Sequence, residues 1–297
     1  MPRKLVSFDW AMKKILRQKA NFGILEGFLT ELLKFDVKIE EILESEANQE
    51  TEEDKFNRVD LLAKNENHEL ILIEIQHRSE IDYFHRMLYG SSKLITEHIQ
   101  KGKGYRRVKK VYSVNIVYFG LGQGEDYIYY GKTEFRGLHK KDDILKPSVG
   151  QKEEFSVDKI YEIYPEYFII KVNEFNDKAK NSLDEWIYFL KNEEIENRFE
   201  TKGLDEAKET LDVMKLGDKD RAVYKRREEN RMYKESILYT AEKRGVKRGE
   251  KIGEKRGEKR GEQRSKIEIA KNLILAKVNI ETIVKSTGLS IEEIKKL

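Results

Sequence analysis

The spacing of apolar residues first divides the chain into helical segments. Between residues 9 and 34 apolar side chains recur every three or four positions, with a break near residues 21–23, which predicts two short helices. Residues 81–100 have the same period and are followed by Gly102, a typical helix stop. We therefore expect a third helix of about five turns there.

Extended segments follow a different pattern. Residues 56–76 contain two apolar runs, 59–63 and 70–75, on either side of a polar stretch, which predicts a β-hairpin. Runs of β-branched and aromatic residues predict three more strands, at residues 111–119, 127–130 and 167–172. The order strand, strand, helix, strand indicates an α/β core.

The C-terminal part is mostly helical in pattern. After about residue 175 apolar positions keep a helical period to residue 243, and they do so again near the C-terminus, where Ser290 and Glu293 form a capping box. Between these parts lie five glycines four residues apart, Gly245, Gly249, Gly253, Gly257 and Gly261. We divide the chain into a core domain (1–175), a helical region (176–240), a repeat that forms a linker or helix (241–264) and a small segment like a helix-turn-helix (265–297).

The predicted hairpin brings polar side chains together. If it is symmetric about Asn67, paired residues have numbers that sum to 134, which sets Asp60 across from Glu74. Side chains alternate along a strand, so Gln76 shares the face of Glu74. Facing carboxylates repel, and a carboxylate in an apolar strand is costly unless a cation neutralises it. Oxygen ligands of this kind suit Mg²⁺. On spacing alone, a solvated strand end without function remains an alternative.

Composition narrows the class of protein. The chain has 297 residues, of which 38% are hydrophobic and 10% aromatic, so it can bury a core. Cysteine is absent, which excludes disulfides and thiolate metal sites, and the five histidines lack zinc-site spacing. No apolar run approaches the roughly 18 residues of a membrane span. We expect a cytoplasmic protein with no membrane partner.

Charge is unevenly distributed along the chain. The net charge is +3, but residues 241–264 hold ten Lys or Arg against five Glu, a net of +5, which leaves the rest of the chain at −2. These cations could bind a DNA backbone, with nearby Glu residues reducing the effect. A solvated linker would have the same composition, and both interpretations stay open.

The hairpin residues also resemble a known family. Val59-Asp60 followed by Ile73-Glu74-Ile75-Gln76 is similar to the motif of PD-(D/E)XK nucleases, and most similar to the Rpn family of recombination-promoting nucleases and transposases. The similarity extends to Asp9 with Lys13, Arg58 before Asp60, Arg86 to Tyr89, and Gly102 to Tyr105 before residues 111–119. The similarity covers roughly residues 5–175, with further likeness in the C-terminal glycine repeat. It implies a restriction-endonuclease-like α/β core, a mixed central sheet flanked by helices, with a mostly helical C-terminal extension.

Two positions depart from the motif. Val59 replaces its Pro, which has no chemical role, and Gln76 replaces its Lys. A neutral amide cannot stabilise developing charge as an ammonium does, but it can orient water or offer its carbonyl oxygen to a metal. The sequence resembles the Rpn family in carrying Gln there.

The resemblance implies a Mg²⁺-dependent DNA endonuclease, a hydrolase linked to recombination or mobile elements, in which Mn²⁺ can replace Mg²⁺. Asp60 and Glu74 would hold the metal, Gln76 would hold the attacking water, and all three would be catalytic. Asp9 would add a further or water-mediated metal contact. As an acid near a helix N-terminus, Asp9 is explained equally well by the helix dipole.

DNA contacts are expected from Arg58, Arg86 and Tyr89, of which the last two share a helix face. An exposed charge and a packed aromatic explain Arg86 and Tyr89 almost as well. The competing function is a catalytically inactive DNA-binding or oligomerising protein on a nuclease-like fold. A homo-oligomer is compatible with either function.

Overall fold

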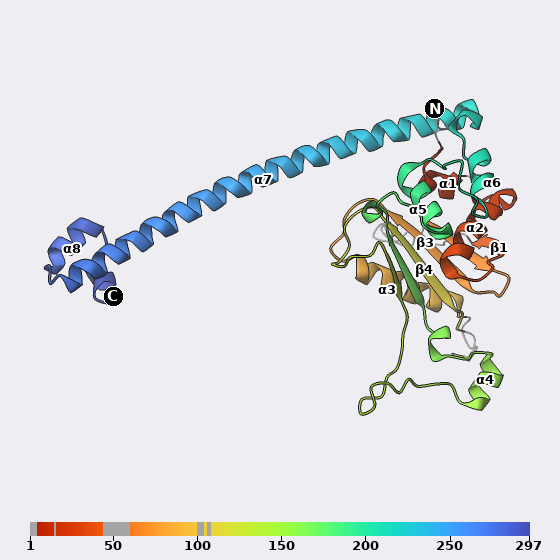
Figure 1. Ribbon diagram of the computed structural model, residues 1–297, viewed down its shortest axis with the longest axis horizontal. Helices are drawn as coiled ribbons and strands as arrows, with labels where there is room; N and C mark the ends of the chain where they lie inside the picture. The colour runs from red at the N-terminus through yellow and green to blue at the C-terminus, as the bar shows by residue number, and fades with distance from the viewer. Residues whose placement is uncertain (1–4, 15, 44–59, 100–103, 106–107) are drawn as a thin grey trace. The chain divides into compact units, whose positions relative to one another are not determined.

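The computed structural model describes residues 5–14, 16–43, 60–99, 104–105 and 108–297 (Figure 1). The chain forms two compact units, residues 1–224 and 225–297, and each is described by itself. Within the described part of the chain, no helix combines the length and apolarity that a membrane crossing requires.

A mixed sheet forms the centre of unit 1. Among the described residues it has six strands: β1 (Ile39–Leu43), β2 (Leu61–Asn65), β3 (Leu70–Gln76), β4 (Val111–Val117), β5 (Ile128–Gly131) and β6 (Glu166–Lys171). Their spatial order is β1-β2-β3-β4-β6-β5. The pairs β3-β4 and β4-β6 are parallel, and the other three pairs are antiparallel. Every strand predicted in the described residues is present.

Helices cover both faces of this sheet. In chain order, the α-helices up to residue 210 are α1 (Phe8–Lys14), α2 (Phe22–Leu33), α3 (Tyr83–His98), α4 (Val149–Phe155), α5 (Ser182–Asn192) and α6 (Leu204–Thr210), of which α4 buries no residue. Helices α1, α2, α5 and α6 contribute to the principal core on one face, whereas α3 packs a smaller cluster on the other. A mixed sheet flanked by helices confirms the expected fold class.

The β2-β3 hairpin has the predicted register. Leu61 pairs with Ile73, and every described pair of this hairpin has numbers that sum to 134. Alternate side chains of β3 then enter different clusters: Ile73 lies in the principal core, whereas Leu72 packs with Leu94 of α3. By the same alternation, Glu74 faces the side of the sheet that α3 covers.

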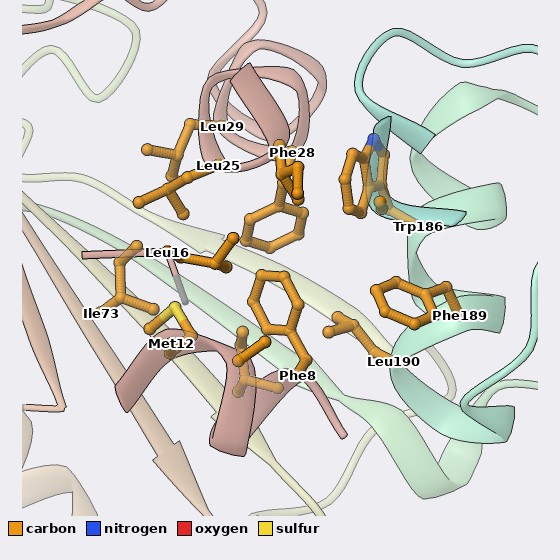
Figure 2. Close-up of a cluster of buried hydrophobic side chains, with 14 of the residues drawn as sticks. Phe8, Met12, Leu16, Leu25, Phe28, Leu29, Ile73, Trp186, Phe189 and Leu190 are labelled. Atoms are coloured by element: carbon orange, nitrogen blue, oxygen red, sulfur yellow. The ribbon is translucent and has the colours of Figure 1, made fainter. Parts of the chain in front are cut away.

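Aromatic rings from distant segments meet in the principal core (Figure 2). The ring of Phe8 lies 5.6 Å from that of Phe28 and 6.0 Å from that of Phe189, both edge to face. Phe28 also contacts Trp186 at 5.7 Å. The sequence separates residues 176–240 as a helical region of their own, whereas α5 contributes Trp186 and Phe189 to the core of unit 1.

Unit 2 is entirely helical in its regular structure. It contains most of α7 (Asp218–Leu275), together with α8 (Ile280–Thr287) and α9 (Ile291–Ile294). The predicted capping box is present, because Ser290 accepts a hydrogen bond from the backbone N–H of Glu293 at 3.2 Å. The glycine repeat lies inside α7, so it forms a helix.

Glycine allows α2 to approach the segment before α6. A Cβ added to Gly27 would lie 2.9 Å from the carbonyl carbon of Lys202 and 3.0 Å from the Cα of Gly203, closer than real Cβ contacts. A Cβ added to Gly90 of α3 would meet only the Leu72 side chain, at an ordinary 3.6 Å. Of these two positions, therefore, only residue 27 requires glycine for packing.

The same substitution at these two positions should have opposite effects. Gly27→Ala should lower the free energy of unfolding by about 1–3 kcal/mol, because the added methyl group forces α2 off the backbone at Lys202. Gly90→Ala should raise it by about 0.5–1 kcal/mol, because alanine loses less backbone entropy in a helix. Urea unfolding followed by circular dichroism measures both. Equal shifts in one direction would contradict this description of the packing.

Candidate active site

Glu74 is a buried carboxylate in an apolar strand. Strand β3 lies between β2 and β4, and its flanking residues Ile73 and Ile75 are buried on the opposite face. The Glu74 side chain is 9% exposed, and its Oε2 has no hydrogen-bond partner among the described residues. Burial raises the pKa of Glu74 to about 7, although the charge of Arg86 opposes the shift.

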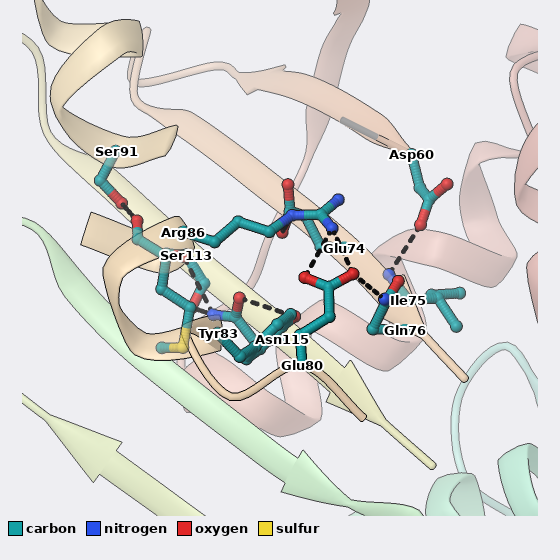
Figure 3. A network of polar contacts seen from close by, with 11 residues as sticks. Asp60, Glu74, Ile75, Gln76, Glu80, Tyr83, Arg86, Ser91, Ser113 and Asn115 are labelled. Carbon is teal, nitrogen blue, oxygen red and sulfur yellow. Dashed lines mark hydrogen bonds and ion pairs between the residues drawn. The ribbon is translucent and has the colours of Figure 1, made fainter. Parts of the chain in front are cut away.

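Asp60 lies at the start of the hairpin, and its carboxylate is directed at the backbone of Ile75, the residue after Glu74 (Figure 3). Its Oδ2 accepts a hydrogen bond from the backbone N–H of Ile75 at 2.7 Å, and its carbonyl oxygen accepts one from Arg17 at 2.8 Å. These bonds hold the Asp60 carboxylate against the end of β3. Its negative charge contributes to the raised pKa of Glu74, so the two carboxylates interact electrostatically.

Arg86 of α3 forms an ion pair with Glu74. Its Nη1 donates to both carboxylate oxygens of Glu80 at 3.1 Å each. Its Nε lies 3.7 Å from Oε2 of Glu74, an ion pair too long for a hydrogen bond. That Nε is also buried without a hydrogen-bond partner in the described chain. Arg86 therefore balances the charge of Glu74 without satisfying its oxygen.

Glu80 connects Arg86 to Gln76. Besides accepting from Arg86, its Oε1 accepts a hydrogen bond from Nε2 of Gln76. Since the amide nitrogen of Gln76 is held there, its carbonyl oxygen is the end that remains to accept a hydrogen bond or to coordinate a cation. Sequence reasoning missed Glu80, because it lies between β3 and α3, where no strand or helix period indicates a direction.

Asp9 lies close to His77, the residue that follows this cluster in the sequence. It is buried on α1, and its Oδ2 lies 3.8 Å from Nε2 of His77, the residue that follows Gln76. The His77 ring stacks on Tyr118 at 4.3 Å. A role for Asp9 at the metal stays a prediction. The position of His77 near this cluster is seen only in the structure, because the histidine spacing in the sequence does not indicate a site.

The predicted DNA-contacting residues have different surroundings. Arg58 lies outside the described residues, as does Val59. Tyr89 on α3 is 52% exposed. Arg86, one helical turn away on the same helix, is directed into the acidic cluster (Figure 3). The helical period predicts that Arg86 and Tyr89 share a face of the helix, but it does not predict which residues surround Arg86.

The residues present fit a hard divalent cation. In the described part of the chain, no three His, Cys, Asp or Glu side chains are grouped closely enough to hold a metal by themselves. Mg²⁺ commonly takes only one or two carboxylates and completes its coordination with water and phosphate oxygens. Asp60, Glu74 and the carbonyl oxygen of Gln76 are the oxygen donors that would supply the protein ligands. The Oε2 of Glu74 has no hydrogen-bond partner among the described residues, and such an ion would supply the partner.

Comparisons with known proteins agree with this geometry at the level of the family. A family model described as "PD-(D/E)XK nuclease family transposase" matches residues 6–241. The match includes the hairpin, α3 and the helices that complete the core of unit 1. Comparisons with curated proteins and with solved structures give no match.

The raised pKa of Glu74 predicts a dependence of stability on pH. Its ordinary pKa is 4.5 and its folded pKa is about 7, so the folded state binds more protons between these values and stability falls as pH rises through them. Glu74→Gln removes this loss. In metal-free buffer, the stability of the variant relative to wild type should therefore increase by up to roughly 3 kcal/mol from pH 4 to pH 8.

Urea unfolding with EDTA at several pH values measures this difference. Glu97→Gln, which removes an exposed acid from α3, is the matched control and should follow the pH profile of wild type near pH 7. A constant difference between Glu74→Gln and wild type across this range would show that Glu74 ionises normally.

Proposed function

The chain belongs to the PD-(D/E)XK nuclease family transposases, and on that premise we propose that it is a Mg²⁺-dependent DNA endonuclease. The observation that carries the proposal is Oε2 of Glu74, a buried carboxylate oxygen without a hydrogen-bond partner among the described residues. A second carboxylate, Asp60, interacts with it electrostatically. A purely structural ion pair would satisfy that oxygen, and Arg86 does not.

Asp60 and Glu74 would hold the metal in this proposal. Bound Mg²⁺ supplies polarisation of the scissile phosphate and a lower pKa for the attacking water, and Mn²⁺ can replace it. Glu80 holds the amide nitrogen of Gln76, which leaves the Gln76 carbonyl oxygen to orient that water or join the metal. Asp9, beside His77, is proposed as a water-mediated contact.

DNA is the proposed substrate, with a role in recombination or in the movement of mobile elements. Tyr89 is exposed on α3 for contact with DNA, and Arg86 could turn from Glu74 to a phosphate once a metal neutralises that carboxylate. Arg58 is proposed as a third contact on its sequence position alone. A cytoplasmic location, where chromosomal DNA is accessible, is part of this proposal.

A second function is favoured by one specific feature. Gln76 is neutral where the motif carries a lysine, so the site has one positive charge fewer to stabilise a developing phosphorane. A catalytically inactive DNA-binding or oligomerising protein on the same fold would have that feature. Activity assays distinguish these functions, because only the first requires the metal.

Removal of either carboxylate should abolish cleavage. With Mg²⁺ and supercoiled plasmid, Asp60→Ala and Glu74→Ala should nick at least about 100-fold more slowly than wild type, because loss of the metal removes several kcal/mol of stabilisation. Asp82→Ala removes an exposed acid from the N-terminus of α3 and should retain activity. Equal background nicking by all four proteins would favour the inactive DNA-binding protein.

The same assay applied to Gln76→Lys tests the role of residue 76. If this position corresponds to the lysine of the motif, cleavage should be maintained or increased, since an ammonium replaces a neutral amide near the phosphate. A complete loss of cleavage with wild-type stability would show instead that the Gln76 carbonyl oxygen is itself a required ligand.

Glu80 should control how readily the metal binds. In Glu80→Ala, Arg86 loses both of its hydrogen bonds to Glu80, and the carboxylate of Glu74 remains as its ion-pair partner. The guanidinium then competes with the cation, so the Mg²⁺ concentration for half-maximal cleavage should rise several-fold. Asp82→Ala is the control of equal charge and should leave that concentration unchanged. An unchanged metal requirement in Glu80→Ala would contradict the positioning role.

A further inference from the structure

Helix α7 carries a charged surface that the nuclease site does not use. Its four-residue repeat places a Lys row at Lys243, Lys247, Lys251, Lys255 and Lys259. An Arg row follows at Arg244, Arg248, Arg256, Arg260 and Arg264. The family model matches residues 6–241, so both rows lie beyond the matched part of the chain.

Helical geometry makes these two rows neighbours. Successive residues of an α-helix are about 100° apart, and a step of four residues exceeds one turn by about 40°. The Lys, Arg, Gly and Glu positions of the repeat therefore form four rows that wind slowly round the helix, each about a quarter turn from the next. The Lys and Arg rows together cover about half of the circumference of α7, with one gap in the Arg row at Ile252.

This basic surface is available to a partner. Every residue from 241 to 265 is exposed. A Cβ added to any of the five repeat glycines would meet nothing within 4 Å, so no other segment of unit 2 packs against this part of α7. In the same region, no ion pair within 4 Å joins a cation of the two rows to a described carboxylate, and the five Glu residues leave a net charge of +5 over residues 241–264.

The net charge of the repeat indicates which class of partner it favours. A second copy of α7 would bring another net charge of +5 against the first, which is unfavourable over most of the repeat. Duplex DNA presents about one negative charge per 1.7 Å of its axis. A helix of 22 residues is about 33 Å long, so it can span many phosphates. The glycine row identifies no partner by itself, whereas the basic rows favour an extended polyanion.

We propose that the Lys and Arg rows of α7 bind the phosphate backbone of duplex DNA without sequence preference. The choice of DNA rests on the proposed function of unit 1, which this inference deepens: binding by α7 would raise the effective concentration of substrate for the active site of the same chain. Attachment through phosphates alone would also leave cleavage tolerant of sequence.

Two matched triple variants of the full chain test the proposal. Lys247, Lys251 and Lys255 are changed to Gln in one, and Glu250, Glu254 and Glu258 are changed to Gln in the other. Both keep helix propensity nearly unchanged, which circular dichroism checks. Binding to a 30-base-pair duplex is measured by fluorescence anisotropy in EDTA between 50 and 200 mM NaCl, so that no cleavage interferes.

The lysine variant should bind at least tenfold more weakly than wild type. Its slope of log affinity against log salt should be smaller by about 2–3, because each lost phosphate contact removes about 0.9. The glutamate variant should bind as tightly as wild type or more tightly. Wild-type affinity and slope in the lysine variant would overturn the proposal, as would loss of self-association in sedimentation velocity with DNA binding intact.

Failure of this inference is distinguishable from failure of the proposed function. If the lysine variant loses DNA binding but wild type never nicks plasmid with Mg²⁺, the role of α7 is supported and the nuclease is not. If nicking depends on Asp60 and Glu74 but the lysine variant binds and cuts as wild type does, the nuclease is supported and the DNA-binding role of α7 is wrong.

Discussion

The burial of one carboxylate, that of Glu74, determines how the rest of the site is arranged. Strand β3 is apolar on both faces, which helices cover, and a charge there costs several kcal/mol unless it is compensated. Arg86 compensates the charge from 3.7 Å but leaves Oε2 without a hydrogen bond. Asp60 adds a second negative charge rather than relieving the first. Such an arrangement is costly for folding and suited to a cation.

The hairpin could be predicted from the sequence because the pattern that determines it is local. A two-residue period and a polar turn determine the register, and β2 and β3 pair as the sum of 134 requires. The direction of Arg86 depends on how α3 docks on the sheet, which no period encodes. Glu80 could not be predicted as a site residue because it belongs to neither a strand nor a helix. Trp186 joins the core of unit 1 through tertiary packing, so the helical region assigned to residues 176–240 could not be placed from its pattern.

The two inferred functions rest on different electrostatics. In unit 1 the charges of Asp60, Glu74 and Arg86 are partly or wholly removed from water, so their interactions are strong and short in range. The Lys and Arg rows of α7 are fully solvated, and salt screens them within about 10 Å at ordinary ionic strength. A metal-dependent step and a salt-dependent attachment to DNA could therefore be adjusted independently, by substitutions in separate parts of the chain.

The central claim is that Asp60 and Glu74 together bind a divalent cation, and crystals soaked in Mn²⁺ test it most directly. Anomalous scattering locates Mn²⁺ without any assumption about activity. The account predicts a peak within about 2.5 Å of a carboxylate oxygen of both residues, with Arg86 displaced from Glu74. A fully soaked crystal with no peak between these two side chains, and with Arg86 still against Glu74, would contradict it.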